Sequence, residues 1–161
     1  MDYFLDSLNR AYSSIHLTIF LIGVTSNVTL LAAAVQRTPA KFKSYSILIK
    51  IGTINDLICV FCDFITMERV LVVPGNLLYI AYGPCIRISV RFCYLVYCLL
   101  LGTIVYSYYV MLSSFIFRLW ILHRPTPRSS SVFAIMIALA IPPAVVLVSS
   151  VCFRFCMFLL L

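Results

Sequence analysis

Two polar residues stand inside long apolar runs of this 161-residue chain, where a side chain needs a protein partner. Asn27 lies ten residues before Arg37, and Asp56 lies thirteen residues after Lys43. At a rise of about 1.5 Å per helical residue, both would lie about 15–20 Å from the same basic boundary. The sequence therefore predicts that Asn27 and Asp56 share a polar network. Such a network can form a proton or cation site, or it can only fix the packing of two helices.

Residue types that carry catalysis are present without the spacing that catalysis needs. The chain has neither the H-E-x-x-H pattern of zinc proteases nor the G-x-S-x-G turn of serine hydrolases. Its two histidines, His16 and His123, are far apart. Cys59 and Cys62 lie in an apolar run with no histidine nearby, which is typical of small buried side chains. We therefore expect no enzyme activity, no cofactor and no metal.

Four other cysteines lie at the ends of apolar runs and are candidates for disulfide bonds. Cys85 and Cys93 lie at one end of the third run, and Cys152 and Cys156 lie at one end of the fourth. If these ends share the oxidising side of a membrane, a disulfide could join the third and fourth runs. The sequence alone does not determine which cysteines pair.

Four apolar runs must position these side chains, over residues 12–35, 44–65, 88–117 and 129–153. Each can form a helix that crosses a hydrocarbon core of about 30 Å, and each is too long for a strand of an outer-membrane barrel. Only 11% of the residues are charged, whereas soluble domains carry about 25%. The sequence thus predicts an all-α membrane protein with a single transmembrane domain over residues 1–161. Hydroxyl groups along the third run predict that it is the central helix of the bundle.

The distribution of basic residues predicts the orientation in the membrane. The connections 36–43 and 118–128 contain six lysine or arginine residues and no acidic residue. Because short basic loops stay on the cytoplasmic side, we expect the N-terminus and the connection between the second and third runs to lie outside. The net charge of +7 reflects these loops. We therefore expect the chain to contact a lipid bilayer and no nucleic acid.

Several segments of the chain resemble one receptor family. They are residues 38–49, at the start of the second run, residues 82–85 with the later Cys93, and residues 114–118, at the end of the third run. Similar segments occur in the same order in nematode chemosensory receptors. The chain is most similar to serpentine receptor class delta, and the resemblance covers about residues 12–150.

The resemblance implies the architecture and the partners of a G-protein-coupled receptor. The four spans would correspond to the N-terminal half of a seven-helix bundle of the rhodopsin type. Asn27 and Asp56 would then match the polar pair of the first two helices. Arg118 would match the arginine that closes the third helix and faces a heterotrimeric G protein. Phe117 precedes it, so the acid or tyrosine usual at that position is absent.

The resemblance also implies a binding site for an external chemical cue. The full-length form would bind a small molecule or a peptide among the aromatic side chains of the third helix. Tyr94 and Tyr97 are candidates, although each could serve only in helix packing. For the disulfide, Cys93 fits the spacing to Arg118 in rhodopsin-like receptors, and Cys85 fits the Gly-Pro-Cys pattern of the chemoreceptors. The resemblance leaves both open.

The chain has four expected spans where that family has seven, so we expect a truncated form that does not signal by itself. Such a form would lie in the plasma membrane or be retained in the endoplasmic reticulum, and it could associate with another copy or with a full-length receptor. The alternative is a complete four-helix membrane protein, acting as a structural or channel subunit that self-associates to cover its polar faces. A stable, ligand-independent oligomer that conducts ions would favour this alternative.

Overall fold

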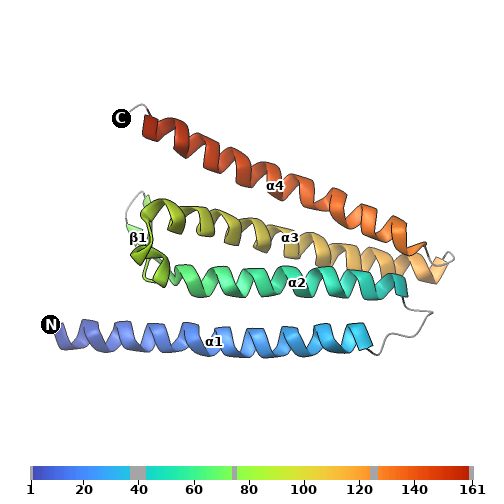
Figure 1. Cartoon of the computed structure of the whole chain (residues 1–161), viewed down its shortest axis with the longest axis horizontal. Coiled ribbons are helices and arrows are strands. Elements are labelled where there is room, and N and C mark those ends of the chain that lie inside the picture. The colour runs from blue at the N-terminus through green and yellow to red at the C-terminus, as the bar shows by residue number, and fades with distance from the viewer. Residues whose placement is uncertain (1, 37–42, 74–75, 124–126, 160–161) are drawn as a thin grey trace.

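Four long helices make up most of the chain in its computed structural model (Figure 1). They are α1 (Asp2–Gln36), α2 (Lys43–Thr66), α3 (Val90–His123) and α4 (Ser129–Leu159). The structure describes the backbone of residues 2–36, 43–73, 76–123 and 127–159, and the side chains of residues 7–36, 44–69, 71, 80–123 and 127–149. Successive helices run in opposite directions, so the N-terminus lies at the end of the bundle where α2 ends and α3 begins (Figure 1).

The helices extend beyond the spans that hydropathy predicts. α1 begins at Asp2 rather than near residue 12, and α3 continues to His123 rather than ending at residue 117. The 34 residues of α3 extend about 51 Å, which exceeds a hydrocarbon core of about 30 Å. Residues 118–123 of the second expected basic connection therefore belong to α3. Residues 37–42 and 124–126 of the two basic connections lie outside the described residues.

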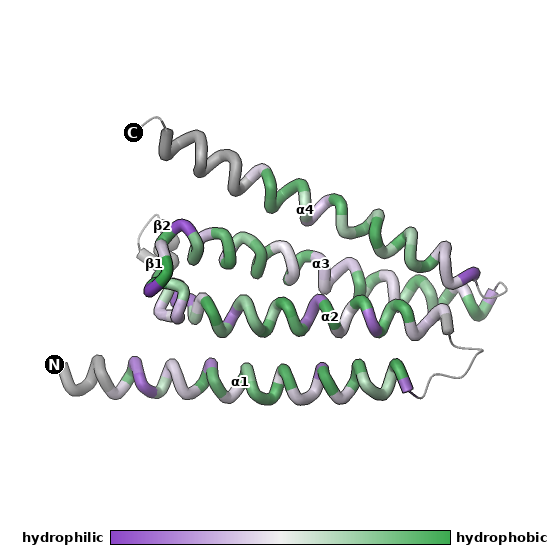
Figure 2. Tube along the Cα trace, in the orientation of Figure 1, coloured by the Kyte–Doolittle hydropathy of each residue, from purple (hydrophilic) through white to green (hydrophobic). Residues whose placement is uncertain are grey.

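Within the described residues, three helical segments are long and apolar enough to cross a membrane. They are Ser7–Gln36, Val90–His123 and Ser129–Ser149. Only 6%, 22% and 17% of the residues in their most apolar stretches are buried, so most of these side chains face outward. α2 differs because Lys50, Asp56 and Asp63 interrupt its apolar sequence, as the purple segments along α2 in Figure 2 show. Its polar side chains therefore depend on neighbouring helices for hydrogen bonds.

α2, rather than α3, is the central helix of the described bundle. It packs against α1, α3 and α4, whereas α1 packs mainly against α2. The prediction that the third helix is central is thus wrong for these four helices, because Tyr108, Met111 and Leu112 of α3 are exposed. Some hydroxyl groups of α3 bond their own helix, as Ser113 Oγ does to the carbonyl of Tyr109 at 2.8 Å. Such a group needs no partner from a second helix.

Two buried clusters hold α2 against its neighbours. One cluster, nearer the end of the bundle where α2 begins, joins α2 to α3 and α4 (Leu48, Phe117, Val132 and Met136). The other, nearer the end where α2 stops, joins α2 to α3 (Cys62, Val96 and Leu100). Together the clusters fix the rotation of α2 about its axis. This rotation decides which of its polar side chains are covered.

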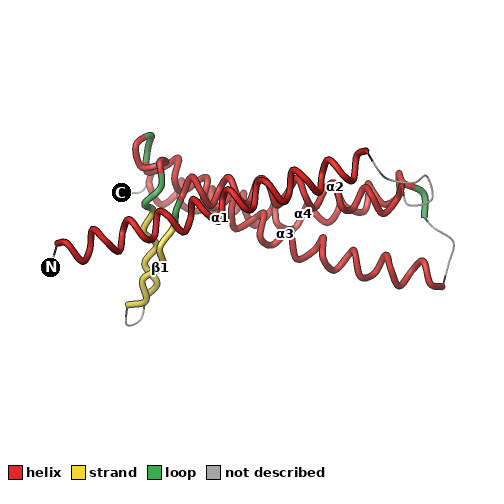
Figure 3. Tube along the Cα trace, turned by 90° about the horizontal axis from the view of Figure 1, so that it is seen from below, coloured by secondary structure: helices red, strands yellow, loops and turns green. Residues whose placement is uncertain are grey.

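A β-hairpin connects α2 to α3, where the sequence analysis expected only a loop. Strands β1 (Glu68–Val73) and β2 (Asn76–Ala81) pair in antiparallel register along their whole length. Valine, isoleucine and tyrosine favour strands, and two residues between paired strands are typical of a tight hairpin. Residues 74–75 themselves lie outside the described residues. Figure 3 shows the hairpin projecting sideways from the bundle, and the short 3-10 helix η2 (Pro84–Arg87) then leads into α3.

The base of the hairpin is fixed where the chain crosses the end of α2. The backbone N–H groups of Tyr82 and Gly83 donate to the carbonyl of Thr66 at 3.2 and 3.0 Å. Gly83 approaches this turn so closely that a Cβ atom there would lie 2.0 Å from the carbonyl oxygen of Ile65. Met67, immediately before β1, has a φ of 40°, a value that few residues other than glycine adopt. The crossing therefore requires glycine at position 83 and holds both ends of the hairpin on α2.

Candidate functional site

A disulfide bond ties η2 to the first turn of α3. Cys85 and Cys93 form this bond across a sequence separation of eight, and their Cα atoms are 5.1 Å apart. Both sulfur atoms are therefore used, so neither can form the expected bridge from the third helix to the fourth. The side chains of Cys152 and Cys156 lie outside the described residues. The local bond is possible because η2 turns the chain back toward the start of α3.

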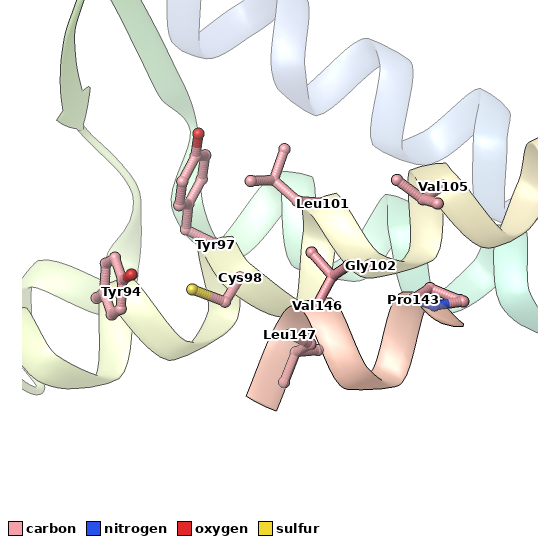
Figure 4. Close-up of a pocket in the computed structure, with 9 residues that line it drawn as sticks. All are labelled: Tyr94, Tyr97, Cys98, Leu101, Gly102, Val105, Pro143, Val146 and Leu147. Carbon is pink, nitrogen blue, oxygen red and sulfur yellow. The ribbon is translucent and has the colours of Figure 1, made fainter. Parts of the chain in front are cut away.

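A cavity of about 120 Å³ lies between α3 and α4, on the part of α3 nearer to the disulfide (Figure 4). Residues from both helices line it (Tyr94, Tyr97, Cys98, Leu101, Gly102, Val105, Pro143, Val146 and Leu147). Figure 4 shows the α4 side chains facing the turn of α3 around Gly102. The structure thus places both tyrosines singled out in the sequence at one cavity, and it adds a wall from α4.

The lining of this cavity is mostly apolar. Gly102 leaves room for the other helix, because a Cβ atom at this position would lie 3.2 Å from Cδ1 of Leu147. The hydroxyl-bearing residues Tyr94 and Tyr97 and the thiol of Cys98 add the few polar groups. Apolar cavities with a few polar groups are typical of sites for small organic molecules. Since an apolar cavity of about 150 Å³ can bind benzene, this one suits a ligand of similar or smaller size.

A polar network joins α2 to α3 near the middle of both helices. Ser107 Oγ donates a hydrogen bond to Asp56 Oδ1 at 2.9 Å. Asn55 Nδ2 donates to Ser107 Oγ at 2.8 Å and to the carbonyl of Thr103 at 3.0 Å. Asn55 and Thr103 are buried, and a buried amide without partners would be costly. The network therefore contributes to the packing of α2 on α3.

The prediction that Asn27 shares a network with Asp56 is wrong. Asn27 Nδ2 donates to the carbonyl of Gly23 in its own helix at 2.9 Å, whereas Asp56 accepts its bond from α3. Equal depth brings two side chains together only if their helices also turn the matching faces toward each other. Asp56 turns toward α3, so the polar pair inferred from spacing is replaced by a contact between the second and third helices.

Arg118 of α3 is held by a tyrosine from α2 at the opposite end from the disulfide. Arg118 Nη2 donates to Tyr45 Oη at 2.8 Å, and Tyr45 Oη lies 3.4 Å from Ser114 Oγ. The Tyr45 ring stacks on Phe117, with 5.7 Å between ring centres. Tyr45 thus supplies the hydroxyl neighbour that the residue before Arg118 cannot. Arg118 remains exposed and lines a groove of about 290 Å³ that also includes Asp56.

Charged and aromatic side chains join α1 to the hairpin at the disulfide end. We call the six residues the hairpin cluster (Tyr12, His16, Asp63, Glu68, Arg69 and Tyr82). His16 Nδ1 lies 3.1 Å from Asp63 Oδ2. The Arg69 guanidinium lies 4.6 Å from the ring centre of Tyr12 and 5.0 Å from that of Tyr82. The Tyr12 hydroxyl donates to the carbonyl of Glu68, so one aromatic side chain of α1 contacts two successive residues of β1.

The carboxyl group of Glu68 is incompletely hydrogen-bonded. Its Oε2 atom is buried and has no hydrogen-bond partner among the described residues. Burial raises the pKa of this carboxyl above its ordinary value, and the nearby Asp63 carboxylate raises it further, whereas His16 acts in the opposite direction. The charged form of Glu68 is therefore disfavoured where it lies.

Several residues that make contacts between elements were not predicted from the sequence. Asn55 precedes Asp56 and is turned from it by about 100° around the helix. Its position next to an intramembrane acid was the sequence signal that could have identified it as part of the polar network. Tyr12 and His16 are four residues apart, which places them on one face of α1, and their ring centres are 4.5 Å apart. No signal in the sequence pairs Tyr45 with Arg118, because they are 73 residues apart.

Comparison with known families gives a match over most of the chain. Residues 12–157 match the family described as "Serpentine type 7TM GPCR chemoreceptor Srd". The match extends past residue 150, where the resemblance was expected to end. No solved structure matches the chain.

Similar proteins from Caenorhabditis elegans include members of serpentine receptor class delta. Serpentine receptor class delta-2 is 30% identical over 135 residues, which cover 84% of this chain and 36% of the relative. Serpentine receptor class delta-26 is 29% identical over 131 residues, which cover 81% of this chain and 41% of the relative. The chain thus spans about two fifths of the length of these relatives. It is a multi-pass integral membrane protein, and it belongs to the Srd family of serpentine seven-transmembrane chemoreceptors.

Proposed function

We propose that this chain supplies the cue-binding part of a chemosensory G-protein-coupled receptor. The cue is a small, largely apolar organic molecule that binds between α3 and α4. The observation that carries this proposal is the apolar cavity, where Tyr94, Tyr97 and Cys98 lie opposite Pro143 and Val146. Membership of a chemoreceptor family supports the same reading. The size of the cavity favours a small molecule over a peptide.

The proposal includes an orientation in which the N-terminus, the hairpin and the disulfide lie outside the cell. The Cys85–Cys93 bond supports it, because disulfides persist on the oxidising side of a membrane. The basic residues toward the other end support it too. An epitope tag at the N-terminus should bind antibody on intact cells. Binding only after permeabilisation would show either the reverse orientation or retention inside the cell, and a tag after His123 would distinguish the two.

The cavity can be tested through Cys98, a buried thiol in its lining. The four cysteines other than Cys98 and the disulfide pair are replaced by alanine, and the rate of labelling by N-ethylmaleimide is followed by mass spectrometry. Small aromatic alcohols, aldehydes and ketones are added as competitors. We expect some of them to slow the labelling. Gly102→Val fills the cavity and should remove this protection, whereas Ala138→Leu adds the same number of carbon atoms at an exposed position of α4 and should preserve it.

The labelling experiment can contradict the proposal in two ways. Labelling of Cys98 that no competitor slows would leave the cavity without a ligand. Protection that survives Gly102→Val would place the competitor elsewhere, for example in the surrounding lipid.

Coupling to a heterotrimeric G protein at the Arg118 end completes the proposal. Arg118 is exposed and its contact with Tyr45 is a hydrogen bond to a neutral group. A photoreactive amino acid at Leu119, which is 61% exposed, should cross-link to a Gα subunit in cells. The same amino acid at Leu101, an exposed α3 position near the cavity, should not. Equal cross-linking at both positions, or none at either, would contradict coupling through this end.

A further inference from the structure

The hairpin cluster joins α1 to β1 through few contacts, and one of them sits beside an unsatisfied carboxyl group. The contacts are the Tyr12 hydroxyl on the carbonyl of Glu68 and the Tyr12 ring against the guanidinium of Arg69. Glu68 Oε2 is buried in the same place without a hydrogen-bond partner among the described side chains. The Glu68 backbone thus accepts a hydrogen bond that docks the hairpin. Its ionised side chain would receive no hydrogen bond at Oε2 from the described residues.

We propose that the hairpin cluster makes the docking of the β1–β2 hairpin onto α1 depend on pH. The hairpin is docked most firmly in mildly acidic solution, and it is released as Glu68 ionises. This inference does not rest on the proposed chemosensory function, since it concerns contacts within the chain alone.

Ionised Glu68 opposes docking because its carboxylate is desolvated there. A buried carboxylate oxygen without a donor loses its hydration and receives nothing in exchange. The carboxylate of Asp63, at the end of α2, adds to the cost of the charge on Glu68. Moving the hairpin away from α1 would return Oε2 to water. Protonated Glu68 avoids the cost of desolvation, so it favours the docked arrangement.

His16 of α1 also faces this site. Its Nδ1 atom lies 3.1 Å from Asp63 Oδ2, and it opposes the rise in the pKa of Glu68. The contact adds a link between α1 and the end of α2. It does not supply the hydrogen-bond donor that Glu68 Oε2 lacks among the described residues.

The other groups that face this site are Arg69 from β1, Tyr12 from α1 and Tyr82 after β2. Asp63 is the acid contributed by α2. The sign of the pH dependence then follows from Glu68. Its pKa is raised in the docked state, so the docked state favours the protonated form of Glu68. Docking is fully favoured below the ordinary glutamate pKa of 4.5 and is weakened as pH rises through the raised value.

The experiment measures the distance between α1 and β1 at two pH values. Spin-labelled amino acids are introduced at Ser13 and Leu71, both exposed, so that all native cysteines remain. The full chain is placed in lipid nanodiscs, and double electron–electron resonance is recorded at about pH 5 and about pH 7.5, a range that lies above the ordinary glutamate pKa of 4.5. We expect the ratio of molecules with the short distance to all other molecules to fall by about threefold or more at the higher pH.

Two matched substitutions separate Glu68 from other acids. Glu68→Gln keeps the size of the side chain without the charge, so the short distance should dominate at both pH values. Asp56→Asn makes the same change at an acid that bonds α3 instead, and it should retain the response of the unmodified chain. A distance distribution that does not change with pH would overturn the proposal, as would a full response in Glu68→Gln.

A measurement on the unmodified chain covers the case in which Glu68→Gln fails to fold, as judged by circular dichroism. The infrared carbonyl band of protonated carboxylic acids is followed through the same pH range. We expect a component of this band to disappear together with the short distance. If the band and the distance titrate in separate pH ranges, Glu68 does not control docking.

Discussion

The two ends of the bundle hold their charged side chains in different ways. At the disulfide end, the Cys85–Cys93 bond joins η2 to α3, His16 of α1 contacts Asp63 of α2, and Arg69 of β1 contacts two aromatic rings. At the other end, Arg118 is held by the hydroxyl of Tyr45. The charged side chains of the first end thus take part in several contacts. Arg118 depends on its contact with Tyr45, which another hydrogen-bond acceptor could replace at little cost.

Loss of the disulfide, which lies at one end only, should cause the largest change in the free energy of unfolding. Cys85→Ser with Cys93→Ser removes a link across eight residues, which we expect to lower the free energy of unfolding by about 2–3 kcal/mol. The free energy is measured by denaturant titration of the chain in micelles, followed by circular dichroism. Reduction of the unmodified chain should cause a similar loss and should not affect the double variant. A double variant as stable as the oxidised chain would show that the bond does not stabilise this end.

Asn55→Leu should weaken the polar network between α2 and α3, which lies midway between the two ends of the bundle. The change removes two hydrogen bonds from a buried side chain, so we expect a loss of about 1–2 kcal/mol in the same titration. Asn27→Leu is the matched control, because Asn27 bonds only its own helix in the described structure. Its effect should be about 0.5 kcal/mol or less. Equal losses in the two variants would contradict the assignment of the network to α2 and α3.

Arg69→Gln should loosen the hairpin without affecting the Arg118 end. It removes a guanidinium that contacts two aromatic rings, at a cost of about 1 kcal/mol. Hydrogen exchange at the amides of Tyr82 and Gly83, which bond Thr66, should become faster. Arg87→Gln changes an exposed arginine nearby and should leave these amides as protected as before. Unchanged exchange in Arg69→Gln would mean that the rings do not hold the hairpin.

Tyr45→Phe should have the smallest effect on stability and a specific effect on Arg118. The variant keeps the ring that stacks on Phe117 and removes the hydroxyl that Arg118 bonds. We expect a loss of about 0.5–1 kcal/mol and greater mobility of the Arg118 guanidinium in nitrogen-15 relaxation spectra. Tyr108→Phe, at an exposed position near the middle of α3, serves as the control. An Arg118 signal that is identical in both variants would show that Tyr45 does not restrain it.

The apolar runs predicted the helices because crossing a membrane requires mainly length and composition. The contacts between helices were less predictable, because they depend on the rotation of each helix about its axis. Asn27 and Asp56 illustrate the difference, since their depth along the chain could be calculated and the faces they occupy could not. Tyr94 and Tyr97 were candidates through the resemblance to chemosensory receptors, and the cavity that includes them also needs the facing residues of α4.

The segments between the spans also carry local signals in the sequence. The β-branched residues around Pro74 and Gly75 favour a hairpin. Cys85 and Cys93 were considered as partners for a distant helix, although a separation of eight residues allows them to bond each other. Both cases concern segments between the spans. There, hydropathy carries little information and turn geometry decides the structure.

The crossing at Gly83 determines how the hairpin can be modified. The hairpin is anchored at its base by the bonds from Tyr82 and Gly83 to Thr66, so changes of length are tolerated only at its far end. Side chains of a strand alternate between faces with a period of two. Residue pairs added between Val73 and Asn76 would therefore lengthen the ribbon without shifting the register at its base. The hairpin is thus a suitable place to graft a peptide epitope or a fluorescent reporter sequence.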